Sequence, residues 1–439
     1  MKSISATITL LFLSFLTYGQ QSALLNELKN KYEPYYQATH IKMGILLKQN
    51  DHFLATRLNF DNDRNTVFNI GSATKTFTAI LILQEVERGT LKLSDSIGKF
   101  LSPIQNISGS LSVEQLLRHE TGLAETVGNQ EWDAYHIPTD SILRADVLQN
   151  VKPQNKKQIG HFVYTNTNYI LLGQILEKIN DQSYFDLLKN RIFTPCGLKN
   201  TYPYVSKSIT NLVHPTDELN EQDQYQGINY KFFADYAFAA GSIASNLEDM
   251  ALFYEHLYKK QTLISQKSLL QMTNFKNGKY GLGLQKLTID ETEYWGHGGN
   301  NYGYAFRNFY NPQTGDMILY FINRFRVPMK NSLNKDLKAI LNHQSIPKFR
   351  TYKTKEFKDF IGEYVLDGLN IKFSIFEKEN FIYFQMQHLK VPLVSYEPNV
   401  LLDVSSGIKF MKSSENPNQL IWFQNRKKLM AKKTLLNID

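Results

Sequence analysis

The sequence has one cysteine among 439 residues, Cys196, so the chain cannot form an internal disulfide and its stability must come from packing. The apolar neighbours of Cys196 predict a small buried side chain and not a nucleophile. The sequence also lacks a His-Glu-x-x-His motif, a cysteine pair and a phosphate-cradling glycine loop. We therefore expect neither a metal ion nor an organic cofactor.

Long apolar runs are also scarce. The one clear run covers residues 4–16, follows the charged start Met1-Lys2-Ser3 and ends before Gly19, which predicts a secretory signal peptide over residues 1–19. An uncleaved anchor is the alternative, but the run is short for a bilayer. No second segment is long and apolar enough to span a membrane. We therefore expect a periplasmic or secreted protein with no stable membrane span after cleavage.

The chain carries no concentrated charge of one sign. Its net charge is +8, but the basic residues are scattered apart from Arg426-Lys427-Lys428 and Lys432-Lys433. This distribution argues against a nucleic-acid partner, and we interpret the basic tail as a solvated strand edge. The expected partner is a small-molecule or peptide substrate, and the oligomeric state stays open.

Helical and strand-like patterns over residues 20–345 predict an α+β fold, in which an antiparallel sheet is flanked by helices and interrupted by an all-helical lobe over 111–193. The helices are expected at 23–36, 72–89, 113–117, 142–148, 169–179 and 334–341. The strands are expected at 40–47, 53–60, 280–284, 293–299, 304–310 and 316–323.

A second unit is expected over residues 346–439. A linker with mixed charge opens it, and short alternating segments separated by turn residues follow, which predicts a small all-β barrel or sandwich. These segments cover 371–376, 381–386, 401–404 and 420–423. We find no catalytic constellation among them.

The first chemical signal is Ser72 followed by Lys75. Gly71 delivers Ser72 onto the first turn of an apolar helix, so the serine and the lysine lie one turn apart on one face. A lysine kept neutral by desolvation can take the proton of a serine hydroxyl and make it a nucleophile. The same spacing recurs at Ser96, Ser332, Ser345 and Ser406, where a surface serine and a solvated lysine explain it.

Two further signals accompany the serine. Tyr164 and Asn166 precede a helical run, where a tyrosine beside a lysine can share the base role and an asparagine can hold both the lysine and a substrate amide. His297 precedes Gly298 and Gly299, which expose backbone N–H groups for a ligand or an oxyanion hole. A buried tyrosine with an asparagine cap, and a structural turn, are the alternative explanations.

Together, Ser-x-x-Lys, Tyr-x-Asn and His-x-Gly resemble the serine β-lactamase and penicillin-binding-protein superfamily, and its class C β-lactamase-like branch in particular. Two longer segments share this resemblance. They are Leu116-Leu117-Arg118-His119-Glu120-Thr121-Gly122-Leu123 and Ala239-Ala240-Gly241-Ser242-Ile243-Ala244-Ser245-Asn246-Leu247-Glu248-Asp249-Met250. The carboxy-terminal unit resembles the lipocalin-like domains that some of these hydrolases carry.

The resemblance implies a serine hydrolase that works through an acyl-enzyme on Ser72. Lys75 and Tyr164 would move the proton, and Asn166 would hold Lys75 and the substrate. The N–H groups of Ser72 and Asn300, the latter just past the His297-Gly298-Gly299 strand, would form the oxyanion hole.

One departure from the family pattern bears on the substrate. Class C β-lactamases have a lysine where this chain has His297, and a neutral histidine attracts a carboxylate less unless Arg307 or Arg324 replaces that charge. A peptidase for D-amino-acid or cell-wall peptides, an esterase and a weak β-lactamase all stay open. The alternative to an enzyme is a catalytically silent scaffold or binding protein of the cell envelope.

Overall fold

The computed structural model describes most of the chain, with the backbone alone for residues 2–18 and 38. The described residues are 2–49, 52–60, 63–126, 147–148, 151–216, 223, 225–227, 230–276, 278–301, 303–325, 327–387, 389–404 and 406–434. Most of the helix expected at 142–148 lies outside them.

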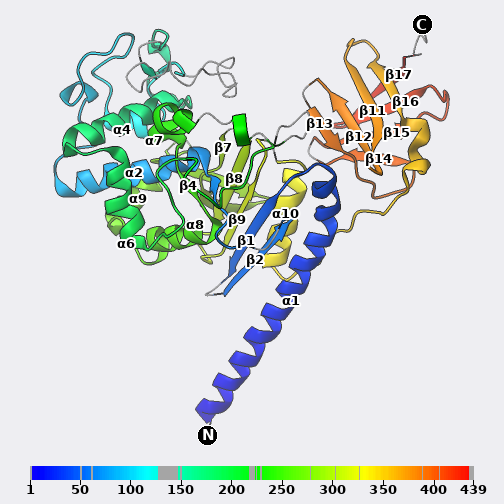
Figure 1. Ribbon diagram of the computed structural model, residues 1–439, viewed down its shortest axis with the longest axis horizontal. Helices are drawn as coiled ribbons and strands as arrows, with labels where there is room; N and C mark the ends of the chain where they lie inside the picture. The colour runs from blue at the N-terminus through cyan, green and yellow to red at the C-terminus, as the bar shows by residue number, and fades with distance from the viewer. Residues whose placement is uncertain are drawn as a thin grey trace.

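A seven-stranded antiparallel sheet forms the centre of the molecule (Figure 1). Its strand order is β2-β1-β9-β8-β6-β5, and β7 also pairs with β8. The strands are β1 Met43–Gln49, β2 His52–Leu58, β5 Gln285–Ile289, β6 Thr292–Gly296, β7 Gly299–Asn301, β8 Tyr304–Tyr310 and β9 Met317–Ile322. Strands from both ends of the region meet in this sheet, so the expected α+β class and the helical insertion are confirmed.

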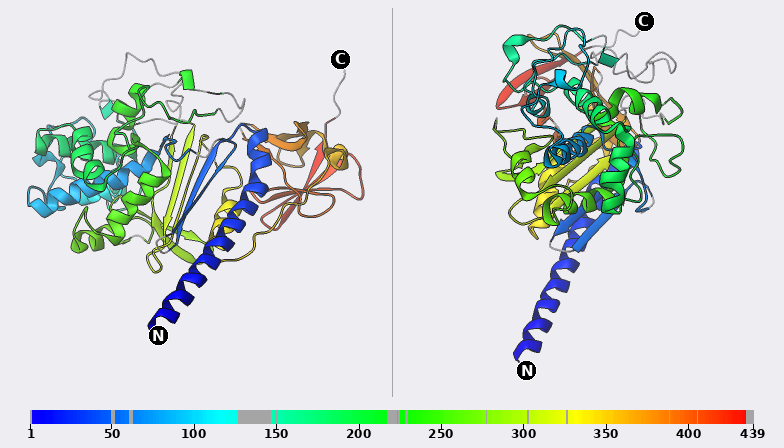
Figure 2. Two further views of the ribbon diagram at one scale, coloured as in Figure 1. Left: turned by 60° about the horizontal axis from the view of Figure 1, so that its bottom comes forward. Right: turned by 90° about the vertical axis from the view of Figure 1, so that its left-hand side faces the viewer.

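Helices cover both faces of the sheet (Figure 2). In β1, Leu46 packs into the core beneath the helical lobe, whereas Ile45 and Leu47 pack into the core beneath α1 (Lys2–Ala38) and α10 (Lys330–Leu341). Because successive side chains of a strand point to opposite faces, a strand buried on both faces must be apolar, as β9 is along its length and β1 is from Met43 to Leu47.

The helix α1 continues from Lys2 to Ala38, and its first half extends away from the rest of the molecule (Figure 1). The expected cleavage point after Gly19 lies within this helix, and the signal peptide stays a prediction. Among the described residues, no helix has both the length and the apolar character that crossing a bilayer requires. The second half of α1 packs on the sheet through Leu28 and Tyr32, in line with the helix expected at 23–36.

The helical lobe lies between β2 and β5 in the sequence and contains the site-bearing helices. Its α-helices are α2 Thr74–Arg88, α3 Val113–Leu117, α4 Asn166–Asn180, α5 Tyr184–Leu188, α6 Thr194–Cys196, α7 Phe238–Gly241, α8 Leu247–Tyr254 and α9 Gln266–Met272. Two short strands, β3 Phe68–Asn69 and β4 Ala244–Ser245, pair beside Ser72. Cys196 is buried, as expected, and this burial raises the pKa of its thiol to about 12.

One expected strand is wrong. Residues 280–284 form a tight turn, in which the Gly281 N–H donates to the Leu284 carbonyl over 2.8 Å and Gly283 has a φ of +66°. Strand β5 begins only at Gln285. The alternation of glycines with large residues suggested a strand. The glycines instead allow the chain to turn, and the turn brings Tyr280 into the interior.

The carboxy-terminal unit is an eight-stranded antiparallel sheet with the order β13-β12-β11-β10-β17-β16-β15-β14. Its strands are β10 Gly362–Leu366, β11 Lys372–Lys378, β12 Phe381–Met386, β13 Leu389–Pro392, β14 Val400–Asp403, β15 Ile408–Lys412, β16 Gln419–Gln424 and β17 Lys427–Lys433. A bridge between Val394 and Leu402 joins the two ends of this order, so the sheet closes into a small barrel. The lipocalin-like resemblance itself stays a prediction.

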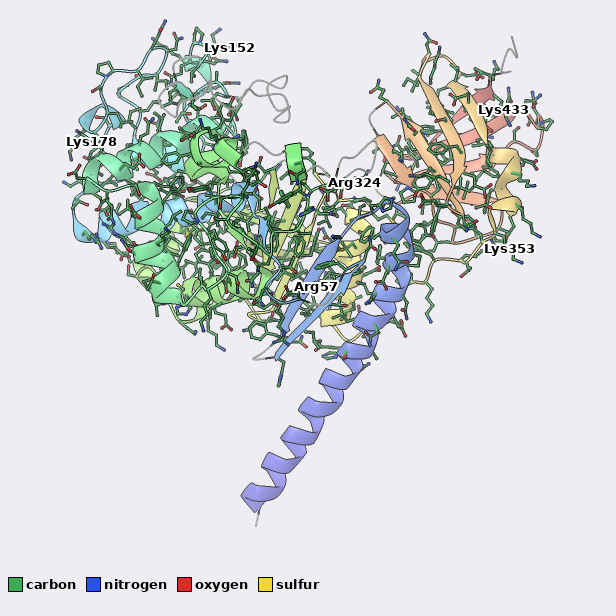
Figure 3. All side chains as sticks on the ribbon, viewed as in Figure 1. Arg57, Lys152, Lys178, Arg324, Lys353 and Lys433 are labelled. Atoms are coloured by element: carbon green, nitrogen blue, oxygen red, sulfur yellow. The ribbon has the colours of Figure 1, made fainter. Side chains whose placement is uncertain are left out.

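Lys432 and Lys433 do not lie at a strand edge, because β17 pairs with β10 there, and β16 pairs with β17 on its other side from Lys427 to Lys432. Its lysine side chains still reach the surface. Figure 3 shows the labelled lysines Lys152, Lys178, Lys353 and Lys433 at widely separated points of the periphery, as a scattered basic charge requires.

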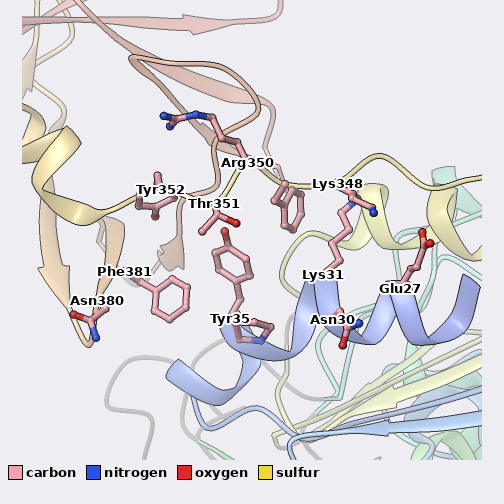
Figure 4. Close-up of a pocket in the computed structure, with 12 residues that line it drawn as sticks. Glu27, Asn30, Lys31, Tyr35, Lys348, Arg350, Thr351, Tyr352, Asn380 and Phe381 are labelled. Atoms are coloured by element: carbon pink, nitrogen blue, oxygen red, sulfur yellow. The ribbon is translucent and has the colours of Figure 1, made fainter.

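The barrel contacts α1 through aromatic side chains. The ring centroids of Tyr35 and Phe381 are 4.9 Å apart, and those of Tyr35 and Phe349 are 5.5 Å apart. A cavity of about 420 Å³ lies beside these rings, between α1, residues 348–352 and the turn at Asn380 (Figure 4). The division of the chain at residue 345 stays our proposal, since Ile346 and Val394 both contribute to the core beneath α1.

Candidate active site

Ser72 lies in the 3₁₀ turn Gly71–Ala73 that leads directly into α2. Strand β7 passes so close to this turn that neither side has room for a side chain. A methyl group on Gly71 would lie 2.9 Å from the Asn300 nitrogen, and one on Gly299 would overlap the Ile70 carbonyl. The expected close approach of the His-Gly-Gly strand to Ser72 is therefore present, with Asn300 beside the serine.

Lys75 is fully buried and makes three short contacts. Its Nζ lies 3.0 Å from Ser72 Oγ, 2.7 Å from Asn166 Oδ1 and 2.7 Å from the Ala240 carbonyl oxygen. Burial lowers the pKa of Lys75 to about 7, and the negative charge of Glu125 opposes this effect. A large neutral fraction at pH 7 leaves the amine able to accept a proton from Ser72.

Asn166 connects the lysine with Glu125. It is the first residue of α4, and its Oδ1 accepts from Lys75 while its backbone N–H and its Nδ2 donate to Glu125 Oε2 over 2.9 and 3.2 Å. The carboxylate thus fixes the orientation of the amide and places a negative charge near the candidate nucleophile. Glu125 had no signal in the sequence, because it belongs to none of the recognised triplets.

Tyr164 lies across the site from Lys75, whose Nζ is 4.9 Å from the centre of the tyrosine ring. The ring is 37% exposed, but its hydroxyl end lies beside Ser72. Burial there raises the pKa of Tyr164, against a smaller lowering effect of the hydrogen bond with Ser72. The phenolate form that a base role for Tyr164 needs is therefore disfavoured, and Tyr164 keeps its proton at neutral pH.

His297 lies behind the site and not on its surface. Its ring is 1% exposed, with Nε2 2.9 Å from the Tyr280 hydroxyl and Nδ1 2.7 Å from the Gly298 carbonyl oxygen. Burial, with the nearby charge of Lys75, lowers the pKa of His297 to about 3, so the ring is neutral at pH 7. Both ring nitrogens contact protein groups, which leaves neither for a substrate.

Arg307 does not replace the missing positive charge at the position of His297. Arg307 Nη1 donates to the carbonyl oxygens of Gly299 and Phe306 over 2.9 and 2.7 Å, and its side chain lies near Tyr320, in the core beneath α1 and α10. Arg324 is only 3% exposed. Neither the neutral His297 ring nor Arg307 therefore offers a substrate carboxylate a positive charge.

The cleft at Ser72 also contains residues that sequence reasoning did not assign to the site. Phe232 and Tyr236, whose ring centroids are 5.3 Å apart, form an aromatic wall. The other residues that line the cleft are Ser72, Asn166, Ala237, Ala240, Gly241, Asn300 and Asn301. Ala240 and Gly241 belong to a segment that resembles the family, but the aromatic wall had no recognisable signal.

The fold and this constellation define a member of the serine β-lactamase and penicillin-binding-protein superfamily. The chain matches the Beta-lactamase family over residues 56–342, and it belongs to that family. The expected family is therefore confirmed. Family membership also supports the expectation of a serine hydrolase.

Two curated relatives illustrate the match. The chain is 28% identical over 250 residues to a penicillin-binding protein of Bacillus subtilis (strain 168), which covers 50% of this chain and 52% of that protein. It is 26% identical over 147 residues to the teichoic acid D-alanine hydrolase of Staphylococcus aureus (strain MRSA252), covering 34% and 35%. The chain thus spans about half the length of the first relative and a third of the second.

Two solved structures share the fold. A D-stereospecific amidohydrolase from Streptomyces sp. has a TM-score of 0.60 and 22% identity, and the match covers 71% of this chain and 96% of that one. An octameric penicillin-binding protein homologue from Pyrococcus abyssi has a TM-score of 0.63 and 19% identity, covering 93% and 99%.

Proposed function

We propose that this protein is a serine hydrolase that cleaves an amide or ester bond through an acyl-enzyme on Ser72. The observation that carries this proposal is the buried Lys75, whose pKa is lowered to about 7 and whose amine lies 3.0 Å from Ser72 Oγ. Burying a lysine next to a serine costs stability, and a general base is the chemical use that explains it.

The proposed reaction has two halves. Ser72 Oγ attacks the substrate carbonyl carbon while its proton passes to Lys75 Nζ, and the oxyanion accepts hydrogen bonds from the N–H groups of Ser72 and Asn300. Lys75 then returns the proton, by way of the Tyr164 hydroxyl, to the leaving nitrogen or oxygen, and the bond to the carbonyl carbon breaks. Water attacks the acyl-enzyme, gives a proton to Lys75, and Ser72 leaves with that proton.

We further propose that the acyl group is a D-amino acid with a free ammonium group. The charges near Ser72 favour a cation over a carboxylate, because Glu125 contributes an anion, whereas His297 is neutral and Arg307 faces the opposite side of the sheet. Both the teichoic acid D-alanine hydrolase and the D-stereospecific amidohydrolase have names that refer to D-configured substrates. A penicillin, which carries a carboxylate, fits this site less well.

The cellular setting is part of the proposal. The predicted signal peptide over residues 1–19 and the relation to cell-envelope hydrolases support a secreted or periplasmic enzyme. There the D-amino-acyl groups of envelope polymers and peptides are within reach.

The experiment that tests the nucleophile is intact-protein mass spectrometry after exposure to a fluorophosphonate and, separately, to a penicillin, with Ser72→Ala as the control. We expect a single fluorophosphonate adduct on the wild type that is absent from the variant. Adduct formation that persists in Ser72→Ala would overturn the assignment. No adduct from either probe on a folded wild type would favour the catalytically silent scaffold.

A matched pair of substrates tests the acyl group. D-alanine p-nitroanilide and its N-acetyl derivative share the D-alanyl unit and the leaving group, and acetylation replaces the ammonium by a neutral, larger amide. We expect kcat/KM to be at least about tenfold higher for the free amine, because one favourable charge contact is worth about 1.4 kcal/mol. Equal values, or a preference for the acetylated compound, would refute the proposed role of Glu125.

A further inference from the structure

A buried chain of hydrogen bonds runs behind the active site and is separate from the contacts of Lys75. Asn168 Nδ2 lies 3.0 Å from His119 Nδ1, His119 Nε2 lies 3.3 Å from the Tyr280 hydroxyl, and that hydroxyl lies 2.9 Å from His297 Nε2. The side chains of all four residues are at most 1% exposed. The chain of hydrogen bonds connects α4, at Asn168, with the segment between β6 and β7, at His297.

The direction of every bond in this chain follows from its two ends. The Gly298 carbonyl can only accept, so His297 Nδ1 carries the hydrogen and, in a neutral ring, Nε2 must accept from Tyr280. At the other end, the Thr165 backbone N–H can only donate to His119 Nδ1, so His119 Nε2 must donate to the Tyr280 oxygen. The Tyr280 hydroxyl therefore accepts from one histidine and donates to the other.

The direction of these hydrogen bonds affects the orientation of strand β7. The His297 ring holds the Gly298 carbonyl, and Arg307 holds the next carbonyl, that of Gly299, over 2.9 Å. These two carbonyls orient the two consecutive peptide groups that end at the Asn300 nitrogen. A turned His297 ring would release the first of them and change where the Asn300 N–H points.

We propose that Tyr280 is a positioning residue for the hydrolysis reaction: its hydroxyl fixes the tautomer and orientation of His297, and through His297 the peptide groups that lead to the Asn300 N–H. This inference rests on the proposed function, in which that N–H is one half of the oxyanion hole. It assigns a role to the turn at 280–284, which belongs to none of the three catalytic triplets.

Other buried tyrosines show that the fold does not require such a partner for every hydroxyl. Among the described residues, the hydroxyl groups of Tyr254 and Tyr258 are buried without a hydrogen-bond partner. Tyr280, in contrast, contacts two histidines whose other nitrogens are both occupied, and its hydroxyl also lies within hydrogen-bond reach of Tyr169. Tyr254 on α8 therefore provides a matched control, because Tyr254→Phe removes a buried hydroxyl without breaking a bond.

The first experiment is a double-mutant cycle on the rate at which a fluorophosphonate phosphonylates Ser72. We expect Tyr280→Phe to lower this rate about ten- to hundredfold, since small misplacements of catalytic groups cost that much, while Tyr254→Phe leaves it unchanged. His297→Asn keeps a donor near the Nδ1 position but has no group at Nε2. In that background Tyr280→Phe should change the rate by less than about twofold. Additive effects of the two substitutions would overturn the proposal.

The second experiment uses the wild-type protein without a substrate, so it depends neither on the folding of a variant nor on catalytic turnover. Long-range ¹H–¹⁵N NMR of the ¹⁵N-histidine-labelled wild type should show one neutral histidine protonated at Nδ1, His297, and one protonated at Nε2, His119. The opposite tautomer at His297 would refute the polarity of the chain even if Ser72 is an active nucleophile. Conversely, the NMR spectrum can show the expected tautomers while neither probe labels Ser72. That result would contradict the proposed function, but it would still support the hydrogen-bond directions between His119, Tyr280 and His297.

Discussion

The charge of Glu125 should set the pH at which Ser72 becomes reactive. Lys75 must be neutral to accept the serine proton, so the acylation rate should rise with pH through a midpoint near the Lys75 pKa of about 7. Glu125 stabilises the protonated amine and raises this pKa. Replacing it by glutamine removes that stabilisation, so the midpoint of Glu125→Gln must move to lower pH.

The structure gives the size of this shift. Asn166 bridges the two charges, with 2.7 Å between its Oδ1 and Lys75 Nζ and 3.2 Å between its Nδ2 and Glu125 Oε2. The two charges are therefore no more than about 8 Å apart, and at an effective dielectric constant of about 20 their attraction is worth about 2 kcal/mol. Glu125 is half-buried, so solvent reduces this value, and we expect the midpoint to fall by about one pH unit.

The assay is the pseudo-first-order rate of fluorophosphonate labelling between about pH 5 and pH 9, followed by intact-protein mass spectrometry. Glu397→Gln, which changes an exposed carboxylate on the barrel by the same chemistry, is the control and should keep the wild-type midpoint. A midpoint that stays in place in Glu125→Gln, or moves to higher pH, would refute the electrostatic reasoning. A wild-type rate that shows no midpoint between pH 6 and pH 8 would refute Lys75 as the base.

Two further predictions concern packing and buried charge. Gly299→Ala should lower the melting temperature and the Ser72 acylation rate, because its methyl group overlaps the Ile70 carbonyl; overpacking of this kind costs about 1–3 kcal/mol. Gly109→Ala, whose methyl group would meet its nearest atom at 3.5 Å, should melt close to the wild type, and equal melting of both variants would contradict the prediction. Lys31→Met removes the charge partner of the buried Asp336, 2.7 Å from the lysine amine, and leaves that carboxylate with the Tyr32 hydroxyl as a donor, and we expect a loss of about 3–5 kcal/mol in urea unfolding. A loss below about 1 kcal/mol would show that water reaches this pair.

Much of the fold could be predicted because local sequence patterns indicate where its helices and strands lie. The strand pattern at 304–310 coincides with β8 from Tyr304 to Tyr310, and the apolar helix ends at Gly89, which has the φ of 77° that a helix-ending glycine adopts. The turn at 280–284 could not be predicted in the same way. Its glycines alternate with large residues as in a strand, and only the contacts with distant helices show why the chain turns there.

The candidate catalytic triplets were visible in the sequence for a similar reason. Ser72 and Lys75 meet because they lie one helical turn apart, and Asn166 starts a helix whose apolar face is readable in the sequence. Phe232 and Tyr236 left no such trace, because the aromatic wall they form depends on how residues 232–237 pack over the cleft.

The sequence by itself indicated which residues are candidates for the chemistry, and it placed Ser72, Lys75, Tyr164 and Asn166 at or just before the starts of helices. Only the tertiary structure decided their protonation states. The pKa of Lys75 is low, that of Tyr164 is high and His297 is neutral because burial disfavours the charged form of each group. Burial arises from segments far apart in the chain, so no local pattern records it.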